Sequence, residues 1–277
     1  MLAIAARNAT LLVGLLFAPA AIAAEMSLRE SVMHPLPLAE VPAMREIADQ
    51  TYLDAAKPDH AYDLYLPDSK APRPLVLMIH GGAPAVSGLR KSPLFRSWAL
   101  QIASRSGAAV AVIGWDGDKR LTGQIDTAYA HIKSRAGEYG IDAARPCILT
   151  FSAGVAAVVP HALRSATIAP RCIVGLYGDW QPAMKALPDV KNVRGLPILV
   201  VRAGRDEIVP DTSAPAFVAA AQAAGADVEV LRHPQGLHVF EIRNPGADTT
   251  RILEATLDFL RVNTRARGRP EPRKNNG

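Results

Sequence analysis

The sequence predicts an α/β protein with a doubly wound, mostly parallel sheet and helices on both faces. Short, almost continuous apolar runs alternate with segments of helical length over most of the chain. Such runs are typical of strands that are buried on both faces of a parallel sheet. The 277 residues, of which 49% are hydrophobic, are enough for one large domain with a sizeable core. The alternation of strand and helix implies right-handed crossovers.

The first segment, 1–24, is predicted to be a secretory signal peptide. It has one basic residue, Arg7, then an apolar stretch over 11–17, and small residues Ala21 and Ala23 before the expected cleavage site. The apolar stretch is too short to span a bilayer. An anchor that stays attached is the alternative. We therefore expect a periplasmic or secreted protein without stable membrane insertion after cleavage.

Residues 25–50 contain several prolines and are expected to form an irregular lead-in to an α/β domain over 51–262. The first strand of that domain, 61–67, alternates as a half-exposed strand would. It is expected to pair antiparallel at the edge of the sheet. The remaining strands are predicted at 74–80, 108–115, 147–151, 172–178, 197–204 and 227–234.

The helices are predicted from apolar residues at helical spacing and from stop signals. Ile125, Tyr129 and Ile132 define one such face, and Gly225 is the expected stop of another helix. The helices are predicted at 93–104, 124–140, 155–163, 214–225 and 249–262.

The formal charge of +5 does not indicate a nucleic-acid partner. The segment 261–277 carries six basic residues and one acidic residue, and Arg7 belongs to the signal peptide, so the rest of the chain has a net charge of about −1. No general basic groove is expected, and therefore no nucleic acid. The tail, 263–277, is expected to be disordered.

The two cysteines, Cys147 and Cys172, each begin an apolar run. If these runs are neighbouring parallel strands, the cysteines could lie at disulfide distance, and an exported protein would meet oxidising conditions. The sequence leaves open whether they form a bridge. Neither cysteine has metal-ligand spacing, and phosphate-loop, dinucleotide and HExxH motifs are absent from the sequence. No metal and no cofactor are expected.

Chemically useful residues follow four of the predicted strands. Gly81 and Gly82 follow the strand at 74–80, and Ser152, Asp206 and His238 follow three later ones. Ligands of open α/β sheets bind outside the carboxyl ends of the strands. The four groups are therefore expected at one edge of the sheet.

Four stretches, DLYLP…HGG (63–82), YGIDAARPCILTFSAG (139–154), GRDEIVP (204–210) and GLHVF (236–240), occur in the order typical of the α/β-hydrolase family. The chain resembles that family over about 62–262, and within it the secreted esterase and dienelactone-hydrolase-like group. The family order is nucleophile, acid, histidine. One departure is Thr150, which stands where the usual nucleophile turn has a glycine.

The resemblance implies a role for each residue. Ser152 would be the nucleophile, His238 its general base and Asp206 the acid that orients the histidine. The oxyanion hole would use the backbone N–H of Ala153 and that of Gly82 or Ala83. His233 is the alternative base, and Asp179 the alternative acid.

These assignments predict a serine hydrolase that cleaves small-molecule carboxylic esters through an acyl-enzyme. The short segment 179–196 leaves no room for a large cap, so it is expected to form a lid or one wall of an open acyl pocket. A catalytically silent scaffold used for binding, and a peptidase of the same fold, are the alternatives. The sequence defines neither the natural substrate nor the oligomeric state.

Overall fold

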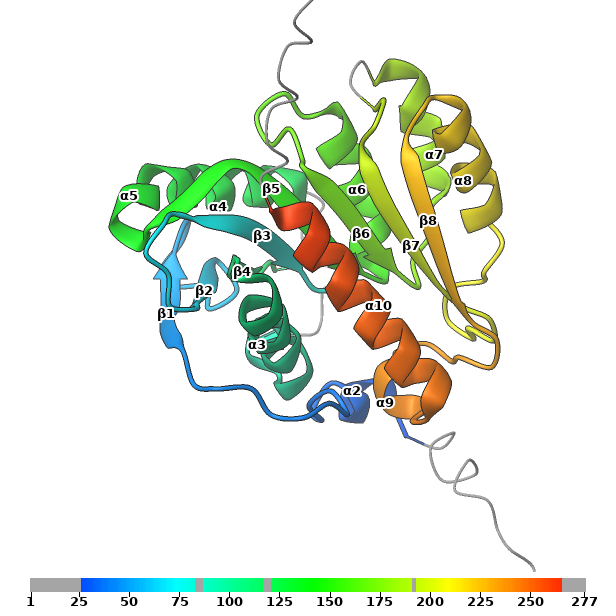
Figure 1. The fold of residues 1–277 in the computed structure, drawn as a ribbon, viewed down its shortest axis with the longest axis horizontal. Coiled ribbons are helices and arrows are strands. Elements are labelled where there is room, and N and C mark those ends of the chain that lie inside the picture. Colours follow the sequence, from blue (N-terminus) through cyan, green and yellow to red (C-terminus); the bar gives the residue numbers. More distant parts are fainter. Residues whose placement is uncertain (1–25, 83–86, 117–120, 191–192, 266–277) are drawn as a thin grey trace, which may run out of the picture.

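The computed structural model describes residues 26–82, 87–116, 121–190 and 193–265. Over these ranges the chain forms one sheet of eight strands in the order β1-β2-β4-β3-β5-β6-β7-β8, with helices on both faces (Figure 1). From β4 to β8 neighbouring strands pair in parallel, whereas β1 and β2 are antiparallel. The predicted fold class is confirmed.

The strands have these bounds: β1 Arg45–Thr51, β2 Ala61–Leu66, β3 Arg73–Ile79, β4 Ala109–Ile113, β5 Ile141–Phe151, β6 Cys172–Leu176, β7 Pro197–Ala203 and β8 Asp227–His233. The α-helices are α2 Leu28–Ser31, α3 Pro93–Ser106, α4 Leu121–Ser134, α5 Ala136–Tyr139, α6 Ala153–Arg164, α7 Gln181–Ala186, α8 Ala214–Ala223, α9 Phe240–Arg243 and α10 Ala247–Thr264. Two 3₁₀ turns, Leu89–Lys91 and Leu187–Asp189, complete the described elements.

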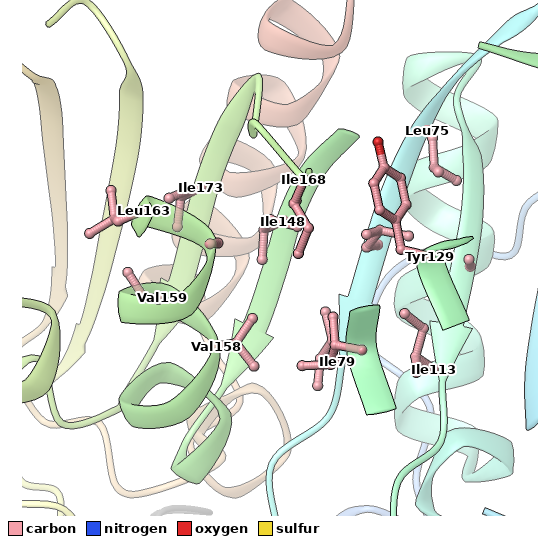
Figure 2. Close-up of a cluster of buried hydrophobic side chains, with 14 of the residues drawn as sticks. Leu75, Ile79, Ile113, Tyr129, Ile148, Val158, Val159, Leu163, Ile168 and Ile173 are labelled. Carbon is pink, nitrogen blue, oxygen red and sulfur yellow. The ribbon is translucent and has the colours of Figure 1, made fainter. Parts of the chain in front are cut away.

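The helices divide between two hydrophobic clusters, one on each face of the sheet. Residues of α4, α6, α7 and α8 pack on one face, and residues of α3 and α10 pack on the other. Figure 2 shows part of the first cluster, where Val158 and Val159 of α6 approach Ile148 and Ile173 of β5 and β6. Both faces of the central strands are therefore buried, which explains their continuous apolar runs.

The prediction of a half-exposed edge strand at 61–67 is wrong. β2 is buried at every position, because β1 pairs along its outer side and β4 along its inner side. β1 is the edge strand, with most of its residues exposed. All of it except its last residue, Thr51, falls in 25–50, where the sequence indicated only an irregular lead-in, so the sheet begins earlier than expected.

Cys147 and Cys172 lie directly opposite each other on the parallel strands β5 and β6 and form a disulfide. Both cysteines are fully buried. The predicted signal peptide and the basic tail lie outside the described residues. Among the helices that are described, none has the length and apolar character needed to cross a membrane.

Candidate active site

Ser152 is held in a sharp turn between β5 and α6. Its φ and ψ angles are +51° and −123°, a conformation that residues other than glycine rarely adopt. The Ser152 N–H donates to the Leu176 carbonyl at the end of β6, at 2.9 Å, and the Ser152 carbonyl accepts from Val155 N at 3.0 Å. Neighbouring elements therefore fix this strained backbone, which presents the side chain beyond the carboxyl end of the sheet.

The turn has room for Thr150 because Gly154 has no side chain. A Cβ on Gly154 would lie 2.3 Å from Thr150 Oγ1. Thr150 is fully buried, and its hydroxyl has no hydrogen-bond partner among the described residues. Close packing continues on either side, since a Cβ on Gly81 would lie 2.8 Å from Ser152 Cβ, and one on Gly178 would lie 2.7 Å from the Ser152 carbonyl oxygen.

A continuous chain of hydrogen bonds joins Ser152, His238 and Asp206. The Ser152 Oγ lies 2.8 Å from His238 Nε2, and His238 Nδ1 lies 2.8 Å from Asp206 Oδ2. With the carboxylate at Nδ1, that nitrogen carries the proton and donates it to Asp206, so Nε2 can accept from the Ser152 hydroxyl. Both side chains are nearly inaccessible, with 4% of His238 and 1% of Asp206 exposed.

The other oxygen of Asp206 organises the loop after β7. Asp206 Oδ1 accepts hydrogen bonds from the backbone N–H groups of Ile208 and Val209, at 2.9 and 2.8 Å. Its neighbour Glu207 points elsewhere, accepts from His238 N at 3.1 Å and pairs with Arg243. Asp206 therefore faces the imidazole, while Glu207 fixes the backbone of the histidine loop.

The alternative base and acid are hydrogen-bonded to other partners. His233, the last residue of β8, bonds Thr249 Oγ1 through Nε2 at 3.1 Å and packs against the ring of Phe240. Asp179 accepts from Gln181 N at 2.9 Å, at the start of α7. In the described part of the chain, the side-chain nitrogens of His238 are hydrogen-bonded to Asp206 and Ser152 instead.

The loop after β3 brings Gly81 and Gly82 beside Ser152. Gly82 has a φ of +113°, in the region that favours glycine. The ring of His80 is buried against Phe95 and Trp115 and donates from Nδ1 to the Gly81 carbonyl at 2.6 Å. Burial lowers the pKa of His80 to about 4, so this ring is neutral and can hold the loop. Of the expected oxyanion-hole residues, Gly82 and Ala153 line the cavity at Ser152, and Ala83 lies outside the described residues.

A cavity of about 470 Å³ opens in front of Ser152 and His238. Most of its wall is apolar, and Arg29 supplies an exposed cation at its margin. The apolar lining residues come from several elements: Leu28, Val32, Leu89, Leu94, Phe95, Phe151, Tyr177, Ile208, Val209 and Val239. A wall of this kind suits a hydrophobic acyl or alcohol group rather than a charged one.

The sequence did not predict one wall of this cavity. Leu28 and Val32 belong to α2 and the residue after it, within the segment expected to be irregular. Ser27 accepts from Glu30 N at 3.2 Å, so the S-x-x-E pattern of a capping box was a local signal for this helical turn. Val32 is also joined to α3 through its carbonyl, which accepts from Leu94 N at 3.2 Å.

In its described residues, 179–190 and 193–196, the expected lid or acyl-pocket wall does not border the cavity at Ser152. Trp180 is buried and stacks on Phe217, because α7 packs into the core on the face that carries α6 and α8. Asp179, Gln181 and Met184 instead line a separate cavity of about 450 Å³. The two cavities share Ile208 and Val209, which lie between them.

In the described ranges, no group of three or more His, Cys, Asp or Glu side chains is arranged to hold a metal ion. The described site consists of the Ser152–His238–Asp206 chain and the cavity in front of it.

The strand order and the position of this site define the α/β-hydrolase fold. Comparison with protein-family models and with curated protein sequences gives no match. Solved structures do match. The chain is similar to carboxyl esterase 2 from the mycorrhizal fungus Tuber melanosporum, at 16% identity and a TM-score of 0.67, over 90% of this chain and 99% of that one.

Two further structural neighbours are esterases by their descriptions. A truncated carbohydrate esterase from gut microbiota matches at 16% identity and a TM-score of 0.66, over 83% of this chain and 99% of that one. Esterase B from Lactobacillus rhamnosis, studied with a tributyrin phosphonate, matches at 17% identity and a TM-score of 0.60, over 81% of this chain and 88% of that one. At these identities the likeness establishes the shared fold.

Proposed function

We propose that this protein is a serine hydrolase that cleaves carboxylic esters through an acyl-enzyme intermediate. The observation that carries the proposal is the unbroken chain from Asp206 through His238 to Ser152, with the serine on a strained turn at the end of a strand. Such a chain activates an alcohol that is a weak nucleophile at its free pKa. The esterase neighbours of the same fold support the reaction class.

In the first half-reaction, Ser152 Oγ attacks the ester carbonyl carbon while His238 Nε2 takes the hydroxyl proton. The new C–O bond gives a tetrahedral intermediate, whose oxyanion would accept hydrogen bonds from the N–H of Ala153 and of Gly82 or Ala83. The intermediate then breaks the bond to the alcohol oxygen, and His238 returns the proton to that oxygen. Asp206 stabilises the imidazolium that exists between these steps.

In the second half-reaction, water attacks the acyl-enzyme and gives its proton to His238. Collapse of the second tetrahedral intermediate breaks the bond to Ser152 Oγ, which recovers its proton from His238. The products are a carboxylic acid and a free serine. The side chains of the site specify acyl transfer, so the preference for esters over amides or thioesters is part of the proposal.

The decisive experiment is active-site labelling with a fluorophosphonate, with Ser152→Ala as the matched control. We expect the wild type to be labelled and the variant not to be. A folded wild-type protein that is not labelled, under conditions where a known serine hydrolase is, would contradict the proposal and favour the binding-scaffold alternative.

The apolar cavity gives a second prediction, which concerns how the rate depends on acyl length. In a series of p-nitrophenyl esters from acetate to octanoate, kcat/KM should rise with acyl length until the cavity is filled, by about fourfold for each buried methylene. Equal, near-background rates across the series would also favour the scaffold. Activity on peptide amides without activity on these esters would favour the peptidase alternative.

We further propose that the protein is exported and that the segment 1–24 is removed. The disulfide between Cys147 and Cys172 supports this proposal, because such bonds persist in oxidising compartments. The test is expression of the full chain in a bacterium, followed by cell fractionation and N-terminal sequencing of the product. Cytoplasmic retention with an intact N-terminus would contradict it.

A further inference from the structure

A fully buried carboxyl, that of Glu241, is hydrogen-bonded to an aromatic residue whose ring packs on the proposed catalytic histidine. Glu241 is three residues after His238, in α9, and none of its surface is exposed. Its Oε1 accepts a hydrogen bond from the Tyr177 hydroxyl at 2.9 Å. Burying a carboxyl is unfavourable unless its interactions compensate for lost hydration. The acyl-transfer steps proposed for Ser152, His238 and Asp206 do not involve this side chain.

Tyr177 connects Glu241 to His238. The Tyr177 and His238 rings meet edge to face, with their centroids 4.8 Å apart, while the phenol hydroxyl of the same ring reaches Glu241. Tyr177 directly follows β6 and has a φ of +38°, which is unusual for a residue with a side chain. Its N–H donates to the Val201 carbonyl at 2.8 Å. The backbone thus keeps this ring between the carboxyl and the imidazole at a conformational cost.

We propose that Glu241, acting through Tyr177, is a positioning residue that holds the His238 ring and stabilises its protonated form during acyl transfer. This inference rests on the proposed function of Ser152, His238 and Asp206. Asp206 contacts the imidazole directly at Nδ1, whereas Glu241 acts on it through the ring of Tyr177, so two carboxyls with different roles would support His238.

The charge of Glu241 changes in the pH range in which a histidine base operates. Burial raises the pKa of Glu241 to about 7, against the opposing effects of its own backbone N–H, Tyr177, the Trp98 indole and the field of His238. Burial, together with the nearby carboxylate of Glu241, holds the pKa of Tyr177 well above its usual value, so its hydroxyl remains a donor.

The elements packed around α9 contribute few other charges. α3 faces Glu241 with the uncharged Trp98, and α10 approaches α9 with the uncharged Thr249. His233 of β8 packs on Phe240, and burial lowers its pKa, which favours the neutral ring. Among the described residues, the other charged groups around this cluster are Asp206, whose field reaches Tyr177, and Arg243 of α9 itself, which pairs with Glu207. α10 adds Asp248 and Arg251, whose opposite charges both act on His233.

An ionised Glu241 would stabilise a protonated His238 by the attraction of opposite charges. Replacing the carboxyl by an amide removes the negative charge and keeps the shape. The imidazole then loses its proton at lower pH, and the imidazolium that forms during catalysis is less stabilised. Removing only the Tyr177 hydroxyl should act in the same direction, because a carboxyl without this donor stays protonated to higher pH.

The experiment is a set of pH profiles of kcat/KM for p-nitrophenyl ester hydrolysis, with wild type, Glu241→Gln, Tyr177→Phe and the double variant. We expect both single variants to move the acid-limb midpoint down by about one pH unit. Their plateau kcat should fall about tenfold, the rate equivalent of one pKa unit. The double variant should match Glu241→Gln, because both changes interrupt one connection. The matched control is Glu254→Gln, an exposed carboxyl of α10 that pairs with Arg105 and should leave the profile unchanged.

A second readout does not depend on hydrolysis. In a ¹⁵N NMR titration of the histidine side chains, the His238 resonances should titrate at lower pH in Glu241→Gln than in wild type.

Thermal melts of each variant check folding, and Tyr177→Phe decides the question if Glu241→Gln does not fold. Profiles and titrations that overlay on wild type would overturn the inference and leave Glu241 as a core residue, and additive shifts in the double variant would overturn the route through Tyr177. A wild type that is inactive and unlabelled at Ser152 would instead overturn the proposed function, while the NMR titration would still test Glu241.

Discussion

Gly154→Ala should disrupt the turn at Ser152, because the added Cβ would overlap the hydroxyl of Thr150. Gly154 lies in the first turn of α6, where alanine is intrinsically favoured over glycine by about 1 kcal/mol. The added Cβ would nevertheless lie 2.3 Å from Thr150 Oγ1, whereas the next contact, the His80 carbonyl oxygen, is at 3.3 Å. Thr150 cannot easily give way, because it is fully buried and paired on both sides, with Ile79 of β3 and Gly175 of β6.

Overpacking of this kind typically costs about 1–3 kcal/mol, and we expect a net loss of about 2 kcal/mol in the free energy of unfolding for Gly154→Ala. Thr150→Ala alone should cost about 1 kcal/mol or less, because the lost methyl contacts are offset by removing a buried hydroxyl without a hydrogen-bond partner. In the double variant the contact at 2.3 Å no longer exists. The double variant should therefore be more stable than the sum of the single effects predicts, by at least about 1 kcal/mol.

The assay is urea unfolding of the four proteins, together with the rate of fluorophosphonate labelling at Ser152. Labelling should fall at least about tenfold in Gly154→Ala and recover most of the loss when Thr150→Ala is added, because the serine backbone regains its conformation. Stability effects that add within about 0.5 kcal/mol would refute the reasoning, since the two residues would then not be in conflict.

Three other features give further predictions. Asp206→Asn should lower kcat by about 10³- to 10⁴-fold, because the histidine loses its orienting carboxylate, whereas Asp179→Asn should change kcat by less than about twofold. Replacing Cys147 and Cys172 by alanine should lower the free energy of unfolding by about 3 kcal/mol, because the bridge closes a loop over a sequence separation of 25. His80 is depressed from its usual pKa of 6.5 to about 4 by burial, so the unfolded chain binds the proton first as the pH falls. The stability that depends on neutral His80 is present above about pH 6.5 and is lost between about pH 6.5 and 4, by at most about 3 kcal/mol, and His80→Gln should remove this part of the pH dependence.

Each of these predictions has an outcome that contradicts it. A larger loss in Asp179→Asn than in Asp206→Asn, in steady-state ester hydrolysis, would move the role of the acid to Asp179. Equal urea midpoints with and without the cysteines would show that the bridge does not constrain the unfolded chain. For His80, the free energies of unfolding of wild type and His80→Gln could fall in parallel between pH 6.5 and 4. That result would show that another group titrates.

Much of the fold could be predicted because the central strands are buried on both faces. β3 to β7 appear as apolar runs, α4 carries an apolar stripe, and α8 ends before a glycine, and these signals do not depend on distant residues. β1 and β2 were harder. β2 alternates in sequence as an edge strand does, but β1 covers its outer side, and that pairing is long-range information.

The candidate site follows the same division. The order of Ser152, Asp206 and His238 along the chain, and their positions after strands, were available from the sequence, because parallel strands end at a common edge. Only the three-dimensional structure distinguishes His238 from His233 and Asp206 from Asp179. His238 lies 2.8 Å from the Ser152 hydroxyl, and Asp206 lies 2.8 Å from the other ring nitrogen of His238. Leu28 and Val32 form one wall of the cavity, and they come from a helical turn far from Ser152 in sequence. The motifs around the catalytic residues do not indicate that this turn reaches the site.

By itself, the sequence determined the parallel α/β architecture and the edge at which its polar residues gather, because hydrophobic periodicity and the alternation of strands and helices along the chain are local properties. Only the tertiary structure decided that Thr150 fits because Gly154 leaves space, that Cys147 lies opposite Cys172, and that Tyr177 joins Glu241 to His238. These relations depend on packing between segments that are brought together by folding, and a packed core tolerates only one such arrangement of side chains.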